Sequence, residues 1–150
     1  MSTIISSTNG VTKIGAGLAR FSGNNSYAGS TTISNGTLEI THNNALGTNA
    51  AGTSVASGAT LQLSSSVSIG TEALSLSGTG VSNGGALRSV SGTNSFAGAI
   101  TLAAASRINS DADSLTLSGN ITNGSNALTV GGAGNTTISG SIGSGAGGLV

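Results

Sequence analysis

The sequence predicts an all-β protein, a β-solenoid of about six coils of roughly 23 residues each. Three observations lead to this fold class: apolar and polar residues alternate in short bursts, Gly, Asn and Ser flank the bursts, and one long segment recurs. With 26 Gly, 5% charged residues and recurrent Ile, Leu and Val, the composition is that of a folded, repetitive chain and not of a disordered linker.

The alternating bursts predict short strands. They are TLEI at 37–40, TLQL at 60–63, ALSL at 73–76, SLTL at 114–117 and ALTV at 127–130. Each places two apolar side chains at i and i+2 on one face of a strand, with a polar residue pointing the other way. The flanking Gly, Asn and Ser residues favour tight turns, and no window carries the apolar stripe and caps of a helix.

A long internal repeat relates two parts of the chain at a constant offset of 69 in the numbering. The segment SGNNSYAGSTT at 22–32 is matched by SGTNSFAGAIT at 91–101. The positions that mark its register are Gly23, Asn25, Tyr27, Gly29 and Thr32, matched by Gly92, Asn94, Phe96, Gly98 and Thr101. Because Phe96 keeps the ring of Tyr27 without its hydroxyl, we interpret both rings as apolar bulk at one corner of every third coil and not as binding anchors.

The offset also predicts how the chain is organised. It divides into three equal coils of the predicted length, and Leu38 to Leu61 is itself a step of 23. The residues GGLV at 147–150 resemble the beginning of the segment at 9–17, at an offset of 138, which is twice 69. We therefore expect residues 1–150 to form a single β-solenoid segment excised from a longer repeat array.

Composition argues against several classes of function. Four Lys and Arg residues balance four Asp and Glu residues, and they are spread along the sequence, so neither a nucleic-acid surface nor a polybasic membrane contact is expected. There is no cysteine for disulfides or thiolate metal sites. The longest nearly apolar stretch, at 99–105, is far shorter than the ~20 residues of a membrane-spanning helix, and residues 1–10 lack the pattern of a signal peptide.

The run VTKIGAGLARFSGNNSYAGSTTISNGTLEI at 11–40 resembles the autotransporter-associated β-strand repeat. That repeat opens with Thr-Lys-x-Gly-x-Gly and continues with Asn-x-Tyr-x-Gly-x-Thr-x-Ile and Gly-Thr-Leu, while the stretches at 99–121 and 126–149 resemble segments between its copies. The resemblance implies a right-handed parallel β-helix in the passenger of a type V secretion protein of a Gram-negative bacterium. It also implies an extracellular or cell-surface location, reached by export as part of a longer protein.

Few residues are candidates for metal binding. Asn109, Asp111 and Asp113 place three oxygen-bearing side chains at alternating positions, as calcium loops do. Counted from Asn109, however, the sixth and twelfth positions are Ser114 and Asn120, where a calcium loop has Gly and Glu. We interpret the segment as a polar turn, with calcium binding as the weaker alternative, and predict no metal site and no cofactor.

No catalytic residue is predicted, so we expect the chain not to be an enzyme. Its acidic residues are Glu39, Glu72, Asp111 and Asp113. Paired-carboxylate glycoside chemistry needs two carboxyl groups within about 5–10 Å, and only Asp111 and Asp113 are close in sequence. His42 follows the strand at 37–40 without a nucleophile-elbow serine, and is expected in an exposed loop.

The function predicted is that of a structural or adhesive extracellular stalk or fibre segment. Its open coil edges favour end-to-end self-association. A glycan- or protein-binding surface module, an adhesin on the same solenoid, remains the alternative, so the expected partners are another copy or an extracellular glycan or protein. Ice binding and polysaccharide degradation are disfavoured. Thr-rich stretches occur at 30–34 and 135–139, but the adjacent coils do not repeat Thr at the matching place.

Overall fold

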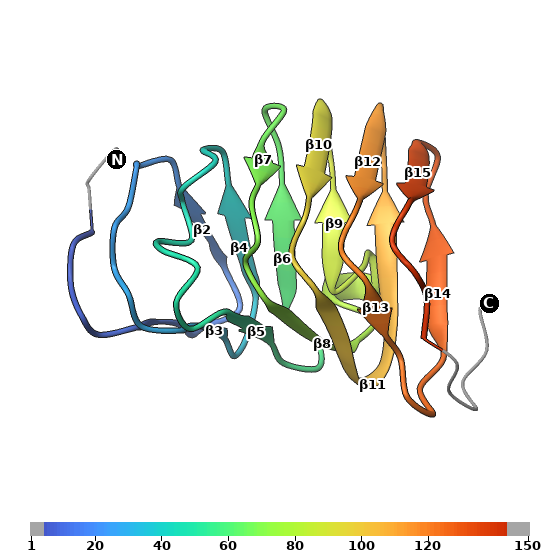
Figure 1. Ribbon diagram of the computed structural model, residues 1–150, viewed down its shortest axis with the longest axis horizontal. Helices are drawn as coiled ribbons and strands as arrows, with labels where there is room; N and C mark the ends of the chain where they lie inside the picture. Colours follow the sequence, from blue (N-terminus) through green and yellow to red (C-terminus); the bar gives the residue numbers. More distant parts are fainter. Residues whose placement is uncertain (1–4, 144–150) are drawn as a thin grey trace.

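Fifteen short strands and one three-residue 3-10 helix, η1 (Val81–Asn83), wind into a solenoid in the computed structural model, which describes residues 5–143. The chain advances along one axis, with the first strands at one end and the last strands at the other (Figure 1). All strand pairs are parallel, and the solenoid has about six coils. The predicted all-β solenoid is confirmed.

The strands form three parallel faces. The first face consists of β1 (Val11–Lys13), β3 (Thr31–Ile33), β5 (Thr53–Val55), β8 (Leu74–Gly78), the first part of β11 (Ile100–Ser110) and β13 (Ile121–Thr122). The second face consists of β2 (Leu18–Phe21), β4 (Thr37–Ile40), β6 (Thr60–Leu63), β9 (Leu87–Ser89), the second part of β11 and β14 (Leu128–Gly131). The third face consists of β7 (Ser68–Ile69), β10 (Thr93–Phe96), β12 (Ser114–Leu117) and β15 (Asn135–Ile138).

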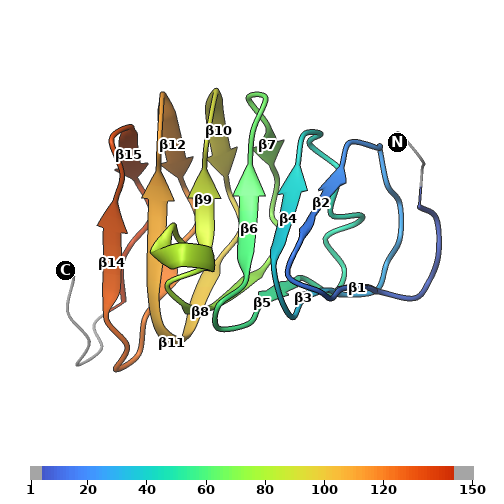
Figure 2. The same ribbon diagram turned by 180° about the vertical axis from the view of Figure 1, so that it is seen from behind.

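The solenoid is right-handed. In Figure 2 the strands of the second face rise on the near side, and the strands of the third face lie behind them. The chain advances in that view from β2 at the right to β14 at the left. A chain that rises on the near side, passes over the top to the far side and advances to the left follows a right-handed helix, which agrees with the handedness that the resemblance implies.

The coils are unequal in length, which corrects the constant spacing expected from the sequence. Thr32 pairs with Ser54, Ser54 with Ser75, and Ser75 with Thr101, so the residue number advances by 22, by 21 and then by 26. The offset of 69 therefore does correspond to three coils. The long step contains η1 in the connection between β8 and β9, and every other step on the first face lies between 20 and 22.

Apolar side chains stack on similar side chains along the axis. On the second face Leu38, Leu61, Leu87 and Ile108 occupy one register position in successive coils, and all four are buried. Each such side chain contributes about 1.5–3 kcal/mol on burial. This aliphatic column gives a chain with 2% aromatic residues a continuous core.

At the N-terminal end of the described solenoid the strands have unpaired edges. β1 pairs only with β3 and β2 only with β4, so one edge of each strand has no partner strand within residues 5–143. Ile14, directly after β1, and Leu18, the first residue of β2, are 73% and 56% exposed. The expected match between residues 147–150 and residues 9–17 lies partly outside the described residues. None of the helices in the described part of the chain is long and apolar enough to cross a membrane.

Candidate functional site

The Asn of the repeated Asn-x-Tyr motif joins successive coils. Asn25 Oδ1 accepts a hydrogen bond from the Ile5 N–H at 2.9 Å, and Asn25 Nδ2 donates to the Ala45 carbonyl at 2.7 Å. Ile5 and Ala45 lie 20 residues before and after Asn25, about one coil in each direction. Because Asn25 is buried, its amide satisfies backbone groups that would otherwise be unpaired at this corner.

Asn94, three coils later, makes the corresponding contact with the preceding coil but donates within its own coil. Its Oδ1 accepts a hydrogen bond from the Val67 N–H at 2.8 Å, and its Nδ2 donates to Ser89 Oγ at 2.8 Å and to the Ser91 carbonyl at 2.9 Å. Asn94 is also completely buried. Both Asn side chains thus accept an N–H from the preceding coil, which gives this position of the repeat a physical role.

The two aromatic rings of the repeat lie in the interior. Tyr27 and Phe96 are completely buried. Phe96 is in register with Ile69 and Leu117 on the third face. The Tyr27 hydroxyl is 2.6 Å from Thr31 Oγ1, so its polar atom has a partner inside the core. Neither ring is available as a surface anchor.

The second glycine of the repeat lies where two coils touch backbone to backbone. A Cβ at Gly29 would be 2.1 Å from the Gly10 nitrogen, and a Cβ at Gly98 would be 1.6 Å from the Glu72 carbonyl oxygen. Side chains do not fit at such distances, so both positions require glycine at the native coil spacing.

The other register positions lie at a corner and on an outer surface. Gly23 is buried, and Gly92 has a φ of 83°, in the left-handed region that favours glycine. The Gly92 N–H donates to Asp113 Oδ2 at 2.7 Å. Thr32 and Thr101 point outward from the first face, three coils apart.

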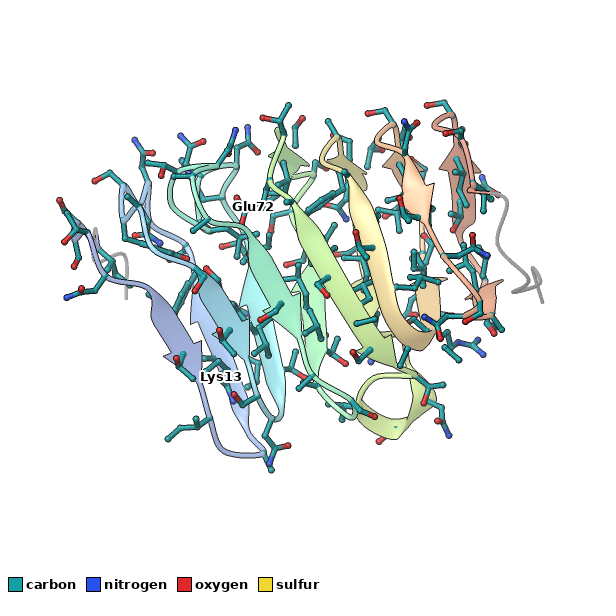
Figure 3. The ribbon with its side chains drawn as sticks, turned by 60° about the horizontal axis from the view of Figure 1, so that its bottom comes forward. Lys13 and Glu72 are labelled. Atoms are coloured by element: carbon teal, nitrogen blue, oxygen red, sulfur yellow. The ribbon has the colours of Figure 1, made fainter. Side chains whose placement is uncertain are left out.

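Lys13 holds the turn between β1 and β2. Its Nζ donates to the carbonyl oxygens of Ile14 at 3.0 Å, Gly15 at 2.6 Å and Asn35 at 3.0 Å; Figure 3 labels Lys13 on β1. Gly36 in the next coil has a φ of 69°, and a Cβ there would lie 2.5 Å from the Gly15 carbonyl oxygen. The Thr-Lys-x-Gly-x-Gly opening thus fastens two successive turns to each other.

These contacts fall largely within one segment that matches a known family. Residues 11–40 match the passenger-associated-transport-repeat family. The resemblance to autotransporter passenger repeats is confirmed by this match and by the β-solenoid fold. The matched repeat comprises β1 to β4 and contains Lys13, Asn25 and Tyr27. No curated protein and no solved structure matches the chain.

Beyond the passenger-associated transport repeat, a buried carboxyl group lies just before β8. Glu72 is 2% exposed, and its Oε1 accepts a hydrogen bond from Thr53 Oγ1 at 2.7 Å. Burial raises the pKa of Glu72, and the hydrogen bond from Thr53 offsets this only in part. Burial also raises the pKa of Tyr27, and the charge of Glu72 adds to that effect. Figure 3 shows Glu72 at the corner above the first face.

On the second face, charged side chains that are distant in sequence lie next to each other. This pairing was not predicted from the sequence. Arg20 forms an ion pair with Glu39 of the next coil, and both belong to the matched repeat. Burial by itself would raise the pKa of Glu39, but hydrogen bonds from Arg20, Ser64 and Gln62 outweigh it and lower that pKa.

Two of the three weak calcium candidates, Asn109 and Asp111, belong to a second charged group at the second face and bind protein donors. Asn109 lies in β11, so the expected polar turn begins only after Ser110. Arg88 Nε donates to Asp111 Oδ2 at 2.8 Å, and Asn109 Nδ2 donates to Asp111 Oδ1 at 2.6 Å. Asn109 Oδ1 accepts from Arg107 Nη2 at 3.0 Å, while Asp113 binds the backbone as described above. Within residues 5–143, no group of three or more His, Cys, Asp or Glu side chains is arranged to hold a metal ion.

His42 lies in the turn that follows β4. Its Nδ1 accepts a hydrogen bond from the Asn44 N–H at 3.1 Å. The side chain is partly exposed, close to the exposed loop position expected from the sequence. Its ring nitrogen therefore stabilises a local turn.

The outer surface of the first face carries a hydroxyl ladder of mixed Ser and Thr. The expectation that adjacent coils do not repeat Thr holds at Ser54 and Ser75, but it is wrong where Thr12 is in register with Thr32 and Thr101 with Thr122. The outward position holds Ser or Thr in six successive coils, at Thr12, Thr32, Ser54, Ser75, Thr101 and Thr122. Coils of equal length could not align these residues, because the true steps range from 20 to 26. The sequence nevertheless carries a pattern that marks the ladder: a Ser or Thr stands at the centre of each short strand sequence VTK, TTI, TSV, LSL and ITL.

Proposed function

We propose that the chain is a structural segment of an extracellular stalk, part of an autotransporter-type passenger at the cell surface or released from it. Support comes from the passenger-associated transport repeat at residues 11–40 and from the solenoid that continues beyond it. The observation that carries the proposal is the uninterrupted aliphatic column, in which Leu38, Leu61, Leu87 and Ile108 repeat one cross-section. A fold that repeats its cross-section extends by addition of coils.

The mechanical role follows from the direction of the hydrogen bonds. Backbone bonds between coils run along the solenoid axis, as in the ladder from β4 to β6 and β9. Each coil adds about one inter-strand distance, ~4.7–4.9 Å, so six coils give a rod on the order of 25–30 Å long. Bending such a rod stretches many of these bonds at once, which makes it a stiff spacer.

Surface display tests the stalk. The chain, in one or two tandem copies, is inserted into the passenger of a displayed autotransporter that carries an epitope at its outer end. We expect the epitope to remain accessible to antibody on intact cells and to move outward by roughly 25–30 Å per copy, the rise of six coils, when its height is measured by electron microscopy. Retention inside the cell, or a height that does not change with copy number, would contradict the proposal.

End-to-end association is the second part of the proposal. The Val11 N–H donates to the Ser30 carbonyl in the next coil. Since successive N–H groups of a strand point to opposite sides, the N–H of Thr12 points away from that coil, toward the open edge of β1. Such an edge can pair with a strand of another copy. Within residues 5–143, β14 and β15 also have no partner strand on their outer edges, so these are the complementary edges at the other end.

Two variants at one position test this association. Thr12→Pro removes the outward N–H without removing the bond from Val11, whereas Thr12→Val keeps the N–H and serves as the matched control. In sedimentation velocity we expect oligomers of the parent and of Thr12→Val that grow with concentration, and a shift of Thr12→Pro toward monomer. A parent that stays monomeric at high concentration would refute end-to-end association and leave the stalk proposal standing.

A further inference from the structure

The hydroxyl ladder of the first face is an unused row of polar groups. Its members are Thr12, Thr32, Ser54, Ser75, Thr101 and Thr122, each in register with the next. Within residues 5–143, none of these six hydroxyls has a hydrogen-bond partner. By contrast, the buried hydroxyls of Thr53 and Ser64 are hydrogen-bonded: Thr53 donates to Glu72, and Ser64 donates to Glu39. A free hydroxyl both donates and accepts, so this face offers both functions once per coil.

A hollow of about 380 Å³ lies on this face beside the ladder. Three ladder residues line it, Ser54, Ser75 and Thr101, together with small neighbours that include Gly52, Ala73 and Ala99. The small neighbours occur in successive coils just before β5, β8 and β11, so the hollow extends along the axis over several coils. Figure 3 turns this face toward the viewer. The free hydroxyls therefore border a recess and not a convex surface.

The face is also poor in charged side chains. Lys13 is the one charged residue in its described strands β1, β3, β5, β8 and β13, and it occupies the inward register position of Ile33 and Val55. Its ammonium group is bound by three backbone carbonyls. The ion pair of Arg20 lies on the second face. A partner that carries many charges would gain nothing here and would lose hydration, so the chemistry favours a neutral partner.

We propose that the first face binds a neutral polysaccharide chain that lies along the solenoid axis in this hollow. An extended glycan presents hydroxyl groups once per sugar ring, at a spacing of the same order as the ~4.7–4.9 Å between strands. Each hydrogen bond is weak, and several in a row act together, so affinity rises with the number of sugars engaged. This binding goes beyond the stalk function and does not depend on it.

Calorimetric titration with defined oligosaccharides tests the proposal. The probes are cellohexaose, chitohexaose and mannohexaose, their disaccharides, and hexagalacturonate as an anionic hexamer. The double variant Ser75→Ala/Thr101→Val removes two neighbouring hydroxyls and keeps side-chain size close to the original. Its control, Thr116→Val/Thr137→Val, removes two neighbouring hydroxyls from the outer surface of the third face, where the residues are also in register.

We expect at least one neutral hexasaccharide to bind, more tightly than its disaccharide and more tightly than hexagalacturonate. The double variant should weaken binding roughly tenfold, since each lost hydrogen bond costs about a factor of two to ten, and the control should bind within about twofold of the parent. The absence of binding by every neutral hexasaccharide, equal binding by the double variant, or preference for the anionic hexamer would overturn the proposal.

Chemical-shift perturbation of the parent protein keeps the test independent of variant folding. The hexasaccharide that binds should shift backbone amide signals of β5, β8 and the first part of β11 and leave those of β12 and β15 unchanged. Shifts confined to the third face would refute the assignment. Such a failure would leave the surface-display result untouched, so the two proposals fail separately.

Discussion

Asn94→Ala is expected to destabilise the solenoid by about 2–4 kcal/mol. Asn94 is completely buried, accepts the Val67 N–H and donates to Ser89 and Ser91. Truncation removes these bonds, each with a net value of about 0.5–1.5 kcal/mol. It also leaves the Val67 N–H without its acceptor, and an unpaired buried donor costs about 1–3 kcal/mol. The contributions overlap, because part of each lost bond is the cost of the unpaired partner.

Asn44→Ala is the matched control for this substitution. Asn44 Nδ2 donates to Asn24 Oδ1 at 2.8 Å, but this bond is exposed, so we expect a loss of less than about 0.5 kcal/mol. Denaturation followed by circular dichroism measures the difference in stability. Repeat proteins can open coil by coil, so hydrogen exchange at the Val67 amide is the sharper assay, and a local loss of about 1–3 kcal/mol should accelerate it roughly 5- to 150-fold.

Two results would refute the reasoning about Asn94. Equal destabilisation by Asn94→Ala and Asn44→Ala would mean that burial of the amide adds nothing to its hydrogen bonds. Unchanged exchange at Val67 would mean that this N–H is not held by the Asn94 side chain. Either result would remove the physical role assigned to the Asn of the repeat.

Three further substitutions test the interior. Folding raises the pKa of Glu72, so the contribution of this group to stability is complete below the ordinary glutamate pKa and is lost as pH rises through the folded-state pKa. The stability of Glu72→Gln relative to the parent should therefore increase from acidic to neutral pH in denaturation curves. A stability difference that stays constant with pH would contradict this. Leu61→Ala in the buried aliphatic column should lower the free energy of unfolding by about 2–5 kcal/mol. Leu18→Ala, at an exposed position, should lower it by less than about 0.5 kcal/mol. Equal melting temperatures of the two variants would argue that the column does not stabilise the fold. The Cβ of Gly98→Ala would meet the Glu72 carbonyl, so this substitution should destabilise the fold by more than about 3 kcal/mol or prevent folding. The control is Gly17→Ala, where a Cβ has nothing within 4 Å. It should retain the parental melting temperature and circular dichroism spectrum.

The repeat register was predictable because it rests on residue types that few positions accept. Tyr27 and Phe96 mark the same corner, and Asn25 and Asn94 make corresponding contacts with the preceding coil. A buried ring, a buried amide and a glycine at a backbone contact each tolerate few substitutes, so they recur visibly in sequence. The strand pattern was likewise readable, since alternation reflects one buried and one exposed side of each strand.

The groups on the outer surfaces were not predictable from a constant period. Arg20 and Glu39 differ by 19 in residue number and pair directly, whereas Ser75 and Thr101 differ by 26 and also lie side by side. The additional length is accommodated in the connection that contains η1. Loops accommodate changes in length without disturbing the hydrogen bonds between strands. The separation of two residues in sequence therefore does not give the number of coils between them.

The sequence by itself determined the period-two strands, the three-coil repeat and the residues that must be small, amide or aromatic inside the corners. These follow from local sterics and from what a buried position accepts. Only the tertiary structure decided that Thr12 to Thr122 form one hydroxyl ladder, that Glu72 is buried, and that Arg20 meets Glu39. Such neighbours are set by the register between coils, and that register depends on the length of every loop between them.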